Sequence, residues 1–252
     1  MYNDIHIGPL TLHMYGLMIA IGFISAYLIS GKRAQKKGLK DSMIDGILWC
    51  AILGGALGSR ILFYIVNLPD IIKDPSILWN FNNGYVVYGG IIGGVLASFF
   101  YCHKKKEAFL PYFDLVMPSV ALAQGFGRFG CFFAGCCYGR ETTSRFGITF
   151  THSAFAPNGV KLVPTQLISA AGDFALAALL YWYARKERED GKVAALYMIL
   201  YSVGRFALEL YRSDFRGSIG PFSTSQLISV AVVVAGVILF FCLPKRKEKK
   251  EV

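Results

Sequence analysis

Charged residues are scarce in this sequence. Asp, Glu, Lys and Arg together make up 17% of the 252 residues, whereas hydrophobic residues make up 54%. A typical soluble domain has about 25% charged and about 45–50% apolar residues. The apolar excess is gathered into long runs rather than spread along the chain. These features exclude a large soluble core and indicate an integral membrane protein.

Signals for processing and for additional domains are also lacking. No basic residue precedes the first apolar run, and no Ala-x-Ala-like site follows it, so we interpret this run as a retained span and not a cleaved signal peptide. No polar stretch is long enough for a separate soluble domain, and no internal repeat is found. We expect one transmembrane domain over residues 1–252.

Seven apolar runs approach the roughly 20 residues that a helix needs to cross a bilayer. They cover residues 14–30, 44–66, 86–101, 113–137, 167–184, 194–211 and 228–243. The sequence therefore predicts an all-α bundle of seven transmembrane helices. The third run is short and rich in glycine, so it is either a tilted span or a partly re-entrant segment.

Basic residues set the expected orientation. The net charge of +10 does not indicate nucleic-acid binding, because the basic residues lie in short connections between apolar runs. Most are in the connections 31–43, 102–112 and 185–193 and in the tail 244–252. The positive-inside rule places these segments in the cytoplasm and the N-terminus outside. The polar connection 138–163 then lies outside, as a small cap or gate with a turn at Asn158-Gly159.

Three arginines, Arg60, Arg128 and Arg205, fall inside predicted spans at or beyond the midpoint. Charges at membrane depth are costly and usually face a cavity or a partner. Arg205 has Glu209 one helical turn away as a candidate partner. If the three arginines share one level, they would form a basic pocket for a phosphate-bearing lipid head group.

Glycines crowd the second and third spans. The pairs Gly54-x3-Gly58 and Gly90-x3-Gly94 are patterns that let membrane helices pack closely. The N–H groups of Gly89 and Gly90 are alternatively available to bind a phosphate. Both interpretations stay open from the sequence.

A cysteine group at the end of the fourth span, Cys131, Cys136 and Cys137, has several interpretations. The spacing is not a common zinc pattern and no histidine is near, so we expect no metal. A disulfide, buried free thiols, and a thiol activated by Arg128 all remain open. Cys50, Cys102 and Cys242 are interpreted as apolar fillers.

Three tyrosines, Tyr15, Tyr88 and Tyr201, lie within or near spans. Tyrosine at a membrane edge is commonly an interface anchor. Tyr201 precedes Arg205 by one helical turn, so the two share a helix face.

The motifs together resemble the bacterial prolipoprotein diacylglyceryl transferase family over all seven spans. The matching segments are Tyr15-Gly16-Leu17-Met18, Gly58-Ser59-Arg60, Gly127-Arg128-Phe129-Gly130 with Gly139, Pro164-Thr165-Gln166-Leu167, and Tyr201, Gly204-Arg205 and Glu209. Four positions depart from the family pattern. Cys131 and Ala134 replace asparagines, Cys136 replaces a glutamate, and Tyr88 replaces a histidine.

The resemblance implies transfer of a diacylglyceryl group from phosphatidylglycerol to the lipobox cysteine of a prolipoprotein, with release of glycerol phosphate. It implies a multi-pass protein of the bacterial inner membrane that needs no cofactor. Catalytic roles fall on Arg128, Arg205, Tyr88 and Tyr201. Substrate-binding roles fall on Tyr15, Arg60, Gly89, Gly90, Gly127, Gly139, Gln166 and Glu209.

Two alternatives follow from the four changed positions. One is a divergent paralogue that moves a lipid-derived group to another acceptor. The other is a non-enzymatic lipid-binding protein, or a thiol-redox membrane protein that uses Cys131, Cys136 and Cys137.

Overall fold

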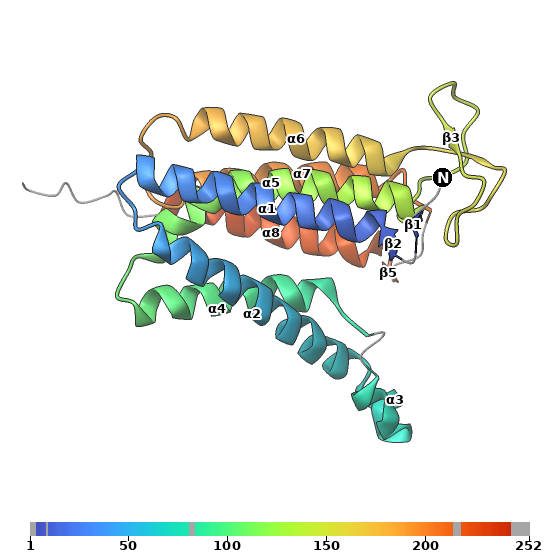
Figure 1. Cartoon of the computed structure of the whole chain (residues 1–252), viewed down its shortest axis with the longest axis horizontal. Coiled ribbons are helices and arrows are strands. Elements are labelled where there is room, and N and C mark those ends of the chain that lie inside the picture. The colour runs from blue at the N-terminus through green and yellow to red at the C-terminus, as the bar shows by residue number, and fades with distance from the viewer. Residues whose placement is uncertain (1–3, 9, 81–83, 214–217, 243–252) are drawn as a thin grey trace, which may run out of the picture. The chain divides into compact units, whose positions relative to one another are not determined.

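The computed structural model describes residues 4–8, 10–80, 84–213 and 218–242, and this part of the chain is mostly helical (Figure 1). Its eight α-helices are α1 (Met14–Lys36), α2 (Ser42–Val66), α3 (Leu68–Lys73), α4 (Val87–Lys104), α5 (Phe109–Ala134), α6 (Thr165–Tyr183), α7 (Lys192–Glu209) and α8 (Thr224–Cys242). A short 3-10 helix, η1 (Pro75–Trp79), follows α3. All seven predicted apolar runs are helical, with ends shifted by a few residues. The basic tail 244–252 lies outside the described residues.

Three helices, α1, α2 and α8, are long and apolar enough to cross a membrane. Their outward side chains are apolar: Ile24 on α1 is 58% exposed, Leu57 on α2 is 65% exposed and Phe241 on α8 is 75% exposed. Rows of large apolar side chains facing outward are expected where the surrounding solvent is lipid. The chain is therefore a membrane protein.

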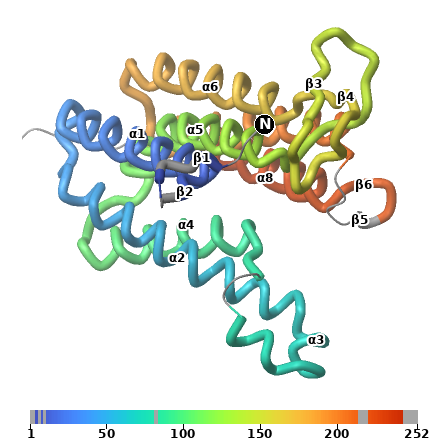
Figure 2. The backbone as a smooth tube through the Cα atoms, turned by 45° about the vertical axis from the view of Figure 1, so that its right-hand side comes forward, coloured from blue at the N-terminus to red at the C-terminus, as the bar shows by residue number. Residues whose placement is uncertain are grey.

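The chain forms two compact units. One combines residues up to Ser30 with those from Phe113 onward, and the other comprises Gly31–Tyr112. In the first unit, α5, α6, α7, α8 and the start of α1 run alongside one another (Figure 2). Leu176 and Leu180 of α6 are buried there with Ala121 of α5 and Val193 of α7.

Polar contacts also fasten the helices of the first unit. Ser119 of α5 hydrogen-bonds to Ser30 of α1 at 3.0 Å and to the Tyr181 hydroxyl of α6 at 2.9 Å. Asp114 of α5 accepts hydrogen bonds from the backbone N–H groups of Gly191 at 2.7 Å and Ala194 at 2.8 Å. These two N–H groups belong to the start of α7, where no carbonyl in the helix can accept them. Asp114 thus caps α7 from a neighbouring helix.

Three short antiparallel hairpins lie at one end of this unit (Figure 1). They are β1 (Asp4–Ile7) with β2 (Leu10–His13), β3 (Ile148–Thr149) with β4 (Lys161–Leu162), and β5 (Ser218–Ile219) with β6 (Phe222–Ser223). The connection 138–163 is ordered around buried Phe150, Ala156 and Leu162, which pack on Phe132 of α5. The turn expected at Asn158-Gly159 is present, with Gly159 at φ +79°. The connection therefore forms a small packed cap.

In the second unit, α2 and α4 pack with almost no side chain between them. A Cβ atom at Gly58 would overlap the Gly89 carbonyl, and one at Gly54 would lie 2.7 Å from the Gly93 carbonyl oxygen. The prediction that these glycines serve close helix packing is confirmed.

Candidate functional site

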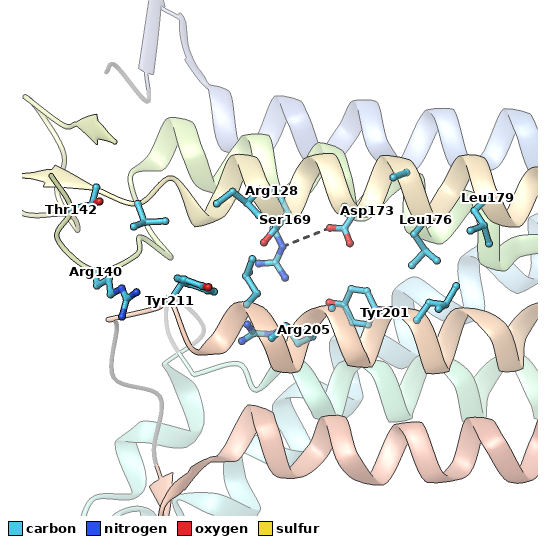
Figure 3. A pocket seen from close by; sticks show the side chains of 18 residues that line it. Arg128, Arg140, Thr142, Ser169, Asp173, Leu176, Leu179, Tyr201, Arg205 and Tyr211 are labelled. Atoms are coloured by element: carbon cyan, nitrogen blue, oxygen red, sulfur yellow. Dashed lines mark ion pairs between the residues drawn. The ribbon is translucent and has the colours of Figure 1, made fainter. Parts of the chain in front are cut away.

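A cavity of about 720 Å³ lies between α5, α6 and α7 in the first unit (Figure 3). One end is lined by polar side chains, and the other by leucines such as Leu176 and Leu179. The polar residues at the wall are Arg128, Arg140, Thr142, Ser169, Asp173, Tyr201, Arg205 and Tyr211. A site of this kind suits a ligand with an anionic head and an apolar body.

Arg128 projects from α5 toward α6, where it meets Asp173 (Figure 3). Arg128 Nε lies 3.9 Å from Asp173 Oδ2, which makes an ion pair too long for a hydrogen bond. Both side chains are largely buried, with 19% and 9% exposed, respectively. Oδ2 of Asp173 has no hydrogen-bond partner among the described residues. The guanidinium of Arg128 therefore keeps donors directed to the cavity.

Arg205, on α7, is held more firmly. Its Nη1 lies 2.6 Å from Glu209 Oε2, and its Nη2 donates to the Ser225 hydroxyl of α8 at 3.1 Å. The predicted ion pair with Glu209 is confirmed. Glu209 also lies 4.0 Å from Arg212 Nε. Arg205 is therefore fixed in orientation while one side of it still faces the cavity.

Tyr201 stands one turn before Arg205 and also lines the cavity. Its ring stacks on Tyr197 with centroids 5.4 Å apart. The Tyr197 hydroxyl donates to Gln124 Oε1 of α5 at 2.9 Å. The stack and the hydrogen bond fix the position of Tyr201 at the wall.

Arg140 closes the polar end. Its backbone N–H donates to the Tyr211 carbonyl at 2.9 Å, and its guanidinium lies 5.1 Å from the centroid of the Tyr211 ring. The cavity wall thus carries three guanidinium groups, and Asp173 is its single carboxylate among the described residues. This excess of positive charge can hold a phosphate and stabilise charge that develops on it.

The three cysteines come together at the end of α5, with Cys131 in its last turn and Cys136 and Cys137 just beyond it. The sulfur atoms of Cys131, Cys136 and Cys137 all lie within 4.8 Å of one another, and all three residues are free thiols. Gln166 Nε2 donates to the Cys136 carbonyl at 2.7 Å, and the Thr165 hydroxyl donates to the Cys137 carbonyl at 2.8 Å. Gln166, predicted as a substrate-binding residue, is 1% exposed and supports this turn.

Comparison with known proteins decides the family. Residues 4–242 match the family described as prolipoprotein diacylglyceryl transferase. The chain belongs to the prolipoprotein diacylglyceryl transferase family. A phosphatidylglycerol–prolipoprotein diacylglyceryl transferase of Clostridium tetani is 46% identical over 231 residues, which cover 92% of this chain and 93% of the relative.

Clostridium perfringens has two similar proteins of this name, numbered 1 and 2. Number 2 is 45% identical to this chain over 243 residues, covering 96% of this chain and 94% of the relative. Number 1 is 34% identical over 257 residues, covering 97% and 95%. The chain thus resembles one member of that pair more than the other.

Several residues that the family resemblance selected lie in the second unit, where each has local contacts. Arg60 Nε donates to the Tyr64 hydroxyl at 2.8 Å, and its Nη atoms donate to the carbonyls of Gly84 at 3.1 Å and Asn80 at 2.7 Å. The carbonyls of Ile77 and Leu78 each lie 3.3 Å from Nη2. Arg60 therefore organises the connection between α2 and α4.

The glycines chosen from the family motifs are mainly packing positions. The N–H groups of Gly89 and Gly90 both donate to the Val86 carbonyl, at 3.0 and 3.3 Å. Tyr88 is half-buried in the first turn of α4. These two N–H groups are used inside the helix, so the structure gives no support to the phosphate alternative.

The remaining family positions lie in the first unit. A Cβ atom at Gly130 would lie 3.1 Å from the Tyr15 ring, so α1 and α5 cross closely there. At Gly139 a Cβ atom would lie 2.7 Å from the Val163 oxygen and 2.9 Å from the Tyr211 oxygen. At Gly127, in contrast, it would meet nothing within 4 Å. Gly139 therefore allows three segments to meet beside the cavity.

Asp173, Arg140, Ser169 and Tyr211 were missed from the sequence. Asp173 could have been found, because it lies inside a predicted span. A carboxylate at membrane depth is costly for the same reason as an arginine there, and it usually has a partner or a function. In the sequence, Arg140 is one of several basic residues in the polar connections and has no distinguishing pattern. Its place at the cavity depends on the fold of the connection 138–163, for which the sequence offers only a turn signal.

Proposed function

We propose that this protein transfers the diacylglyceryl group of phosphatidylglycerol to the cysteine thiol of a prolipoprotein. The observation that carries the proposal is the cavity in which Arg128, Arg140 and Arg205 face one end and leucines line the other. Phosphatidylglycerol has a matching division between an anionic phosphate and apolar chains. Membership of the family and the names of the relatives support the same reaction.

The reaction substitutes sulfur for oxygen on one carbon of the lipid. The acceptor thiol loses its proton, and its sulfur forms a C–S bond with the diacylglyceryl carbon. The C–O bond to the phosphate breaks, and glycerol phosphate leaves with the bonding electron pair. The proton goes to the leaving phosphate or to water, so atoms and charge balance.

We assign the phosphate to Arg128 and Arg205. Their guanidinium groups hold the charge that grows on the leaving oxygen, and the forked donors match phosphate oxygens. Arg205 is preorganised by Glu209 and Ser225, which lowers the cost of aligning it. We assign to Tyr201 the role of orienting the lipid by hydrogen bonding, and to the leucine end the binding of an acyl chain.

The remaining sequence predictions form part of the same proposal. The seven long helices span the bacterial inner membrane as one domain, with the N-terminus outside and the C-terminus in the cytoplasm. The family resemblance assigns substrate-binding roles, which we keep as part of the proposal, to Tyr15, Arg60, Gly89, Gly90, Gly127, Gly139, Gln166 and Glu209. It assigns a catalytic role to Tyr88, which we likewise keep as part of the proposal. The cap 138–163 then faces outward, where a translocated prolipoprotein would present its cysteine.

The decisive experiment uses purified protein in vesicles that contain phosphatidylglycerol labelled in its terminal glycerol. Addition of a lipobox peptide should release labelled glycerol phosphate and increase the peptide mass by one diacylglyceryl group. The same peptide with serine in place of cysteine should give neither product. Lipid binding without release of glycerol phosphate would refute the proposal and favour a lipid-binding protein.

Variants at the cavity sharpen this test. Arg128→Ala should lower turnover by about 10²–10³, the typical loss when one stabilising donor of a developing charge is removed. Arg188→Ala is the matched control, because Arg188 is exposed and stacks on the Tyr183 ring away from the cavity. Full activity of Arg128→Ala would exclude the head-group role of Arg128. Turnover only with a different thiol acceptor would identify a divergent paralogue.

A further inference from the structure

We propose that Cys131, Cys136 and Cys137 form a zinc site whose fourth coordination position takes the cysteine thiol of the acceptor peptide. The evidence for the metal site is the geometry of the three cysteines and does not depend on the proposed function. The role of the fourth position rests on the proposed function. The proposal replaces the expectation from the sequence that the chain binds no metal.

The backbone at the end of α5 explains why the sulfur atoms meet. The N–H of Cys136 donates to the Cys131 carbonyl at 3.1 Å, and the N–H of Gly135 donates to the Phe132 carbonyl at 3.2 Å. With Gly135 at φ +73°, these bonds form a Schellman motif. The motif turns the chain back over the last helical turn. Cys136 is thereby brought next to Cys131 although five positions separate them in sequence.

The third cysteine is held in an unusual conformation. Cys137 has φ +61°, which a residue with a Cβ atom seldom adopts outside sites where the surroundings impose it. The hydrogen bonds from Gln166 and Thr165 to the carbonyls of Cys136 and Cys137 fix this turn. Both donors lie at the start of α6, so a neighbouring helix holds the backbone of Cys136 and Cys137 before any metal binds.

The donor set fits a soft metal ion with an open position. Zinc–sulfur bonds of about 2.3 Å around a tetrahedral ion put the sulfur atoms about 3.8 Å apart. The observed spread of up to 4.8 Å therefore needs only a small contraction. Among the described residues, no fourth Cys, His, Asp or Glu joins the group. Three protein ligands with one free position are typical of catalytic zinc rather than structural zinc.

Positive groups balance the charge of three thiolates. Arg128 precedes Cys131 by three residues on α5, and residues with this spacing have Cβ atoms about 5–6 Å apart. The Arg212 guanidinium interacts with the Cys137 thiol, and its side chain is 3% exposed. A trithiolate zinc centre has a net charge of −1, which these two guanidinium groups offset.

Such a centre would deprotonate the acceptor thiol, a step for which the changed family motif offers no carboxylate base. Cys131 and Cys136 replace the asparagine and glutamate of the family pattern. A thiol bound to zinc is deprotonated outright, so no side-chain base is required. The acceptor thiol would displace a water from zinc, release its proton to solvent, and attack the diacylglyceryl carbon as a thiolate. The C–S bond forms while the C–O bond to phosphate breaks, with no change in oxidation state.

The test measures metal binding first and activity second. Purified wild-type protein in detergent micelles should bind one equivalent of Zn²⁺ in competition with a coloured chelator. X-ray absorption at the zinc edge should report three sulfur ligands at about 2.3 Å and one lighter ligand. Addition of the lipobox peptide should convert this shell to four sulfur ligands, and the peptide with serine should leave it unchanged.

Matched variants identify the ligands. Cys136→Ser and Cys131→Ser should each weaken zinc binding by at least 100-fold, whereas Cys50→Ser, a change in the second unit, should leave it unchanged. The thermal midpoint of each metal-free variant controls for misfolding. Gln166→Ala retains all three thiols but removes the hydrogen bond to the Cys136 carbonyl. It should weaken zinc binding about 10-fold or more, as loss of a group that orients a ligand does.

The outcomes separate the site from the reaction. Failure of wild-type protein to bind Zn²⁺ tightly, selective binding of Cu(I) instead, or a disulfide among the three cysteines would overturn the zinc site. If zinc is bound by three sulfur ligands and the peptide adds no fourth, only the proposed role of the acceptor thiol is overturned, and the metal site is retained. If diacylglyceryl transfer is absent but the zinc shell is as described, the proposed function fails and the metal site stands.

Discussion

Arg128 Nε on α5 and Asp173 Oδ2 on α6 lie 3.9 Å apart at the wall of the cavity. Asp173 is the single carboxylate among the described cavity residues, so it competes with an anionic ligand for Arg128. We expect Asp173→Asn to tighten binding of phosphatidylglycerol by about 3–10-fold, since about 1 kcal/mol of competition is removed. The measurement is the KM for lipid in mixed micelles.

A lipid without a phosphate provides the control for this substitution. Diacylglycerol has the same acyl chains but no anionic group to compete for Arg128, so its binding to Asp173→Asn should match its binding to the wild type. Weaker binding of both lipids would contradict the competition and indicate that Asp173 mainly orients Arg128. A fall in kcat together with the fall in KM would show that both effects operate.

Arg60 gives a second prediction, in the α2–α4 unit. Arg60→Ala removes the charged donor to the carbonyls of Asn80 and Gly84. The Ile77 carbonyl keeps the Asn80 N–H, and the Leu78 carbonyl keeps the Tyr64 hydroxyl. Loss of a hydrogen bond from a charged donor costs about 1.5–3 kcal/mol. We expect a lower thermal midpoint and faster proteolysis of the connection between α2 and α4, with Lys73→Ala as the control. A raised KM for phosphatidylglycerol with unchanged proteolysis would instead assign Arg60 to the lipid.

Gly58 tests the close contact between α2 and α4. Gly58→Ala places a methyl group against the Gly89 backbone, which cannot move as a side chain can. Overpacking of this kind costs about 1–3 kcal/mol. The midpoint of thermal unfolding in detergent should fall, whereas Gly31→Ala, where a Cβ atom meets nothing within 4 Å, should not lower it. Equal midpoints for the two variants would show that the helices separate readily.

Asp41 provides a pH prediction in the connection before α2. Hydrogen bonds from Gln35 Nε2 at 3.0 Å and the Ser42 N–H at 2.9 Å lower the pKa of the Asp41 carboxyl. Its contribution to stability is therefore present above the unfolded pKa of about 3.9 and is lost as the pH falls through the lower folded value.

Hydrogen exchange at the start of α2 measures this effect. In the wild type, amide protection there should decrease as the pH falls below about 4. Asp41→Asn keeps a capping side chain but cannot titrate, so its protection should lack this component. An identical pH profile for both proteins would exclude Asp41 as the titrating group.

The helices could be predicted because apolar runs of span length leave little alternative to helix in a membrane. The glycine pairs likewise predicted the α2–α4 packing, since Gly54 and Gly58 repeat at helical spacing. Arg205 and Glu209 were found as a pair for the same reason, because both lie on one turn. Local spacing along a helix was thus a reliable guide.

Contacts between distant segments could not be predicted in this way. Asp173 meets Arg128 only because α5 and α6 pack side by side, and no spacing in the sequence relates them. Arg140 reaches the cavity through the backbone pairing of the connection with Tyr211. The closeness of Cys131 and Cys136 depends on the turn at Gly135, whose conformation the sequence interpretation did not consider.

The cap that Asp114 places on α7 has a mechanical consequence. It joins the start of α7 to α5, and Arg128 lies about 21 Å further along α5 at 1.5 Å per residue. The Tyr197 hydroxyl fastens α7 to Gln124 of α5 a second time, about 15 Å further along α5. The two helices are therefore held together at two levels, and both cavity arginines lie beyond the second one. A lipid that enters at the polar end would meet the helices past these two attachments.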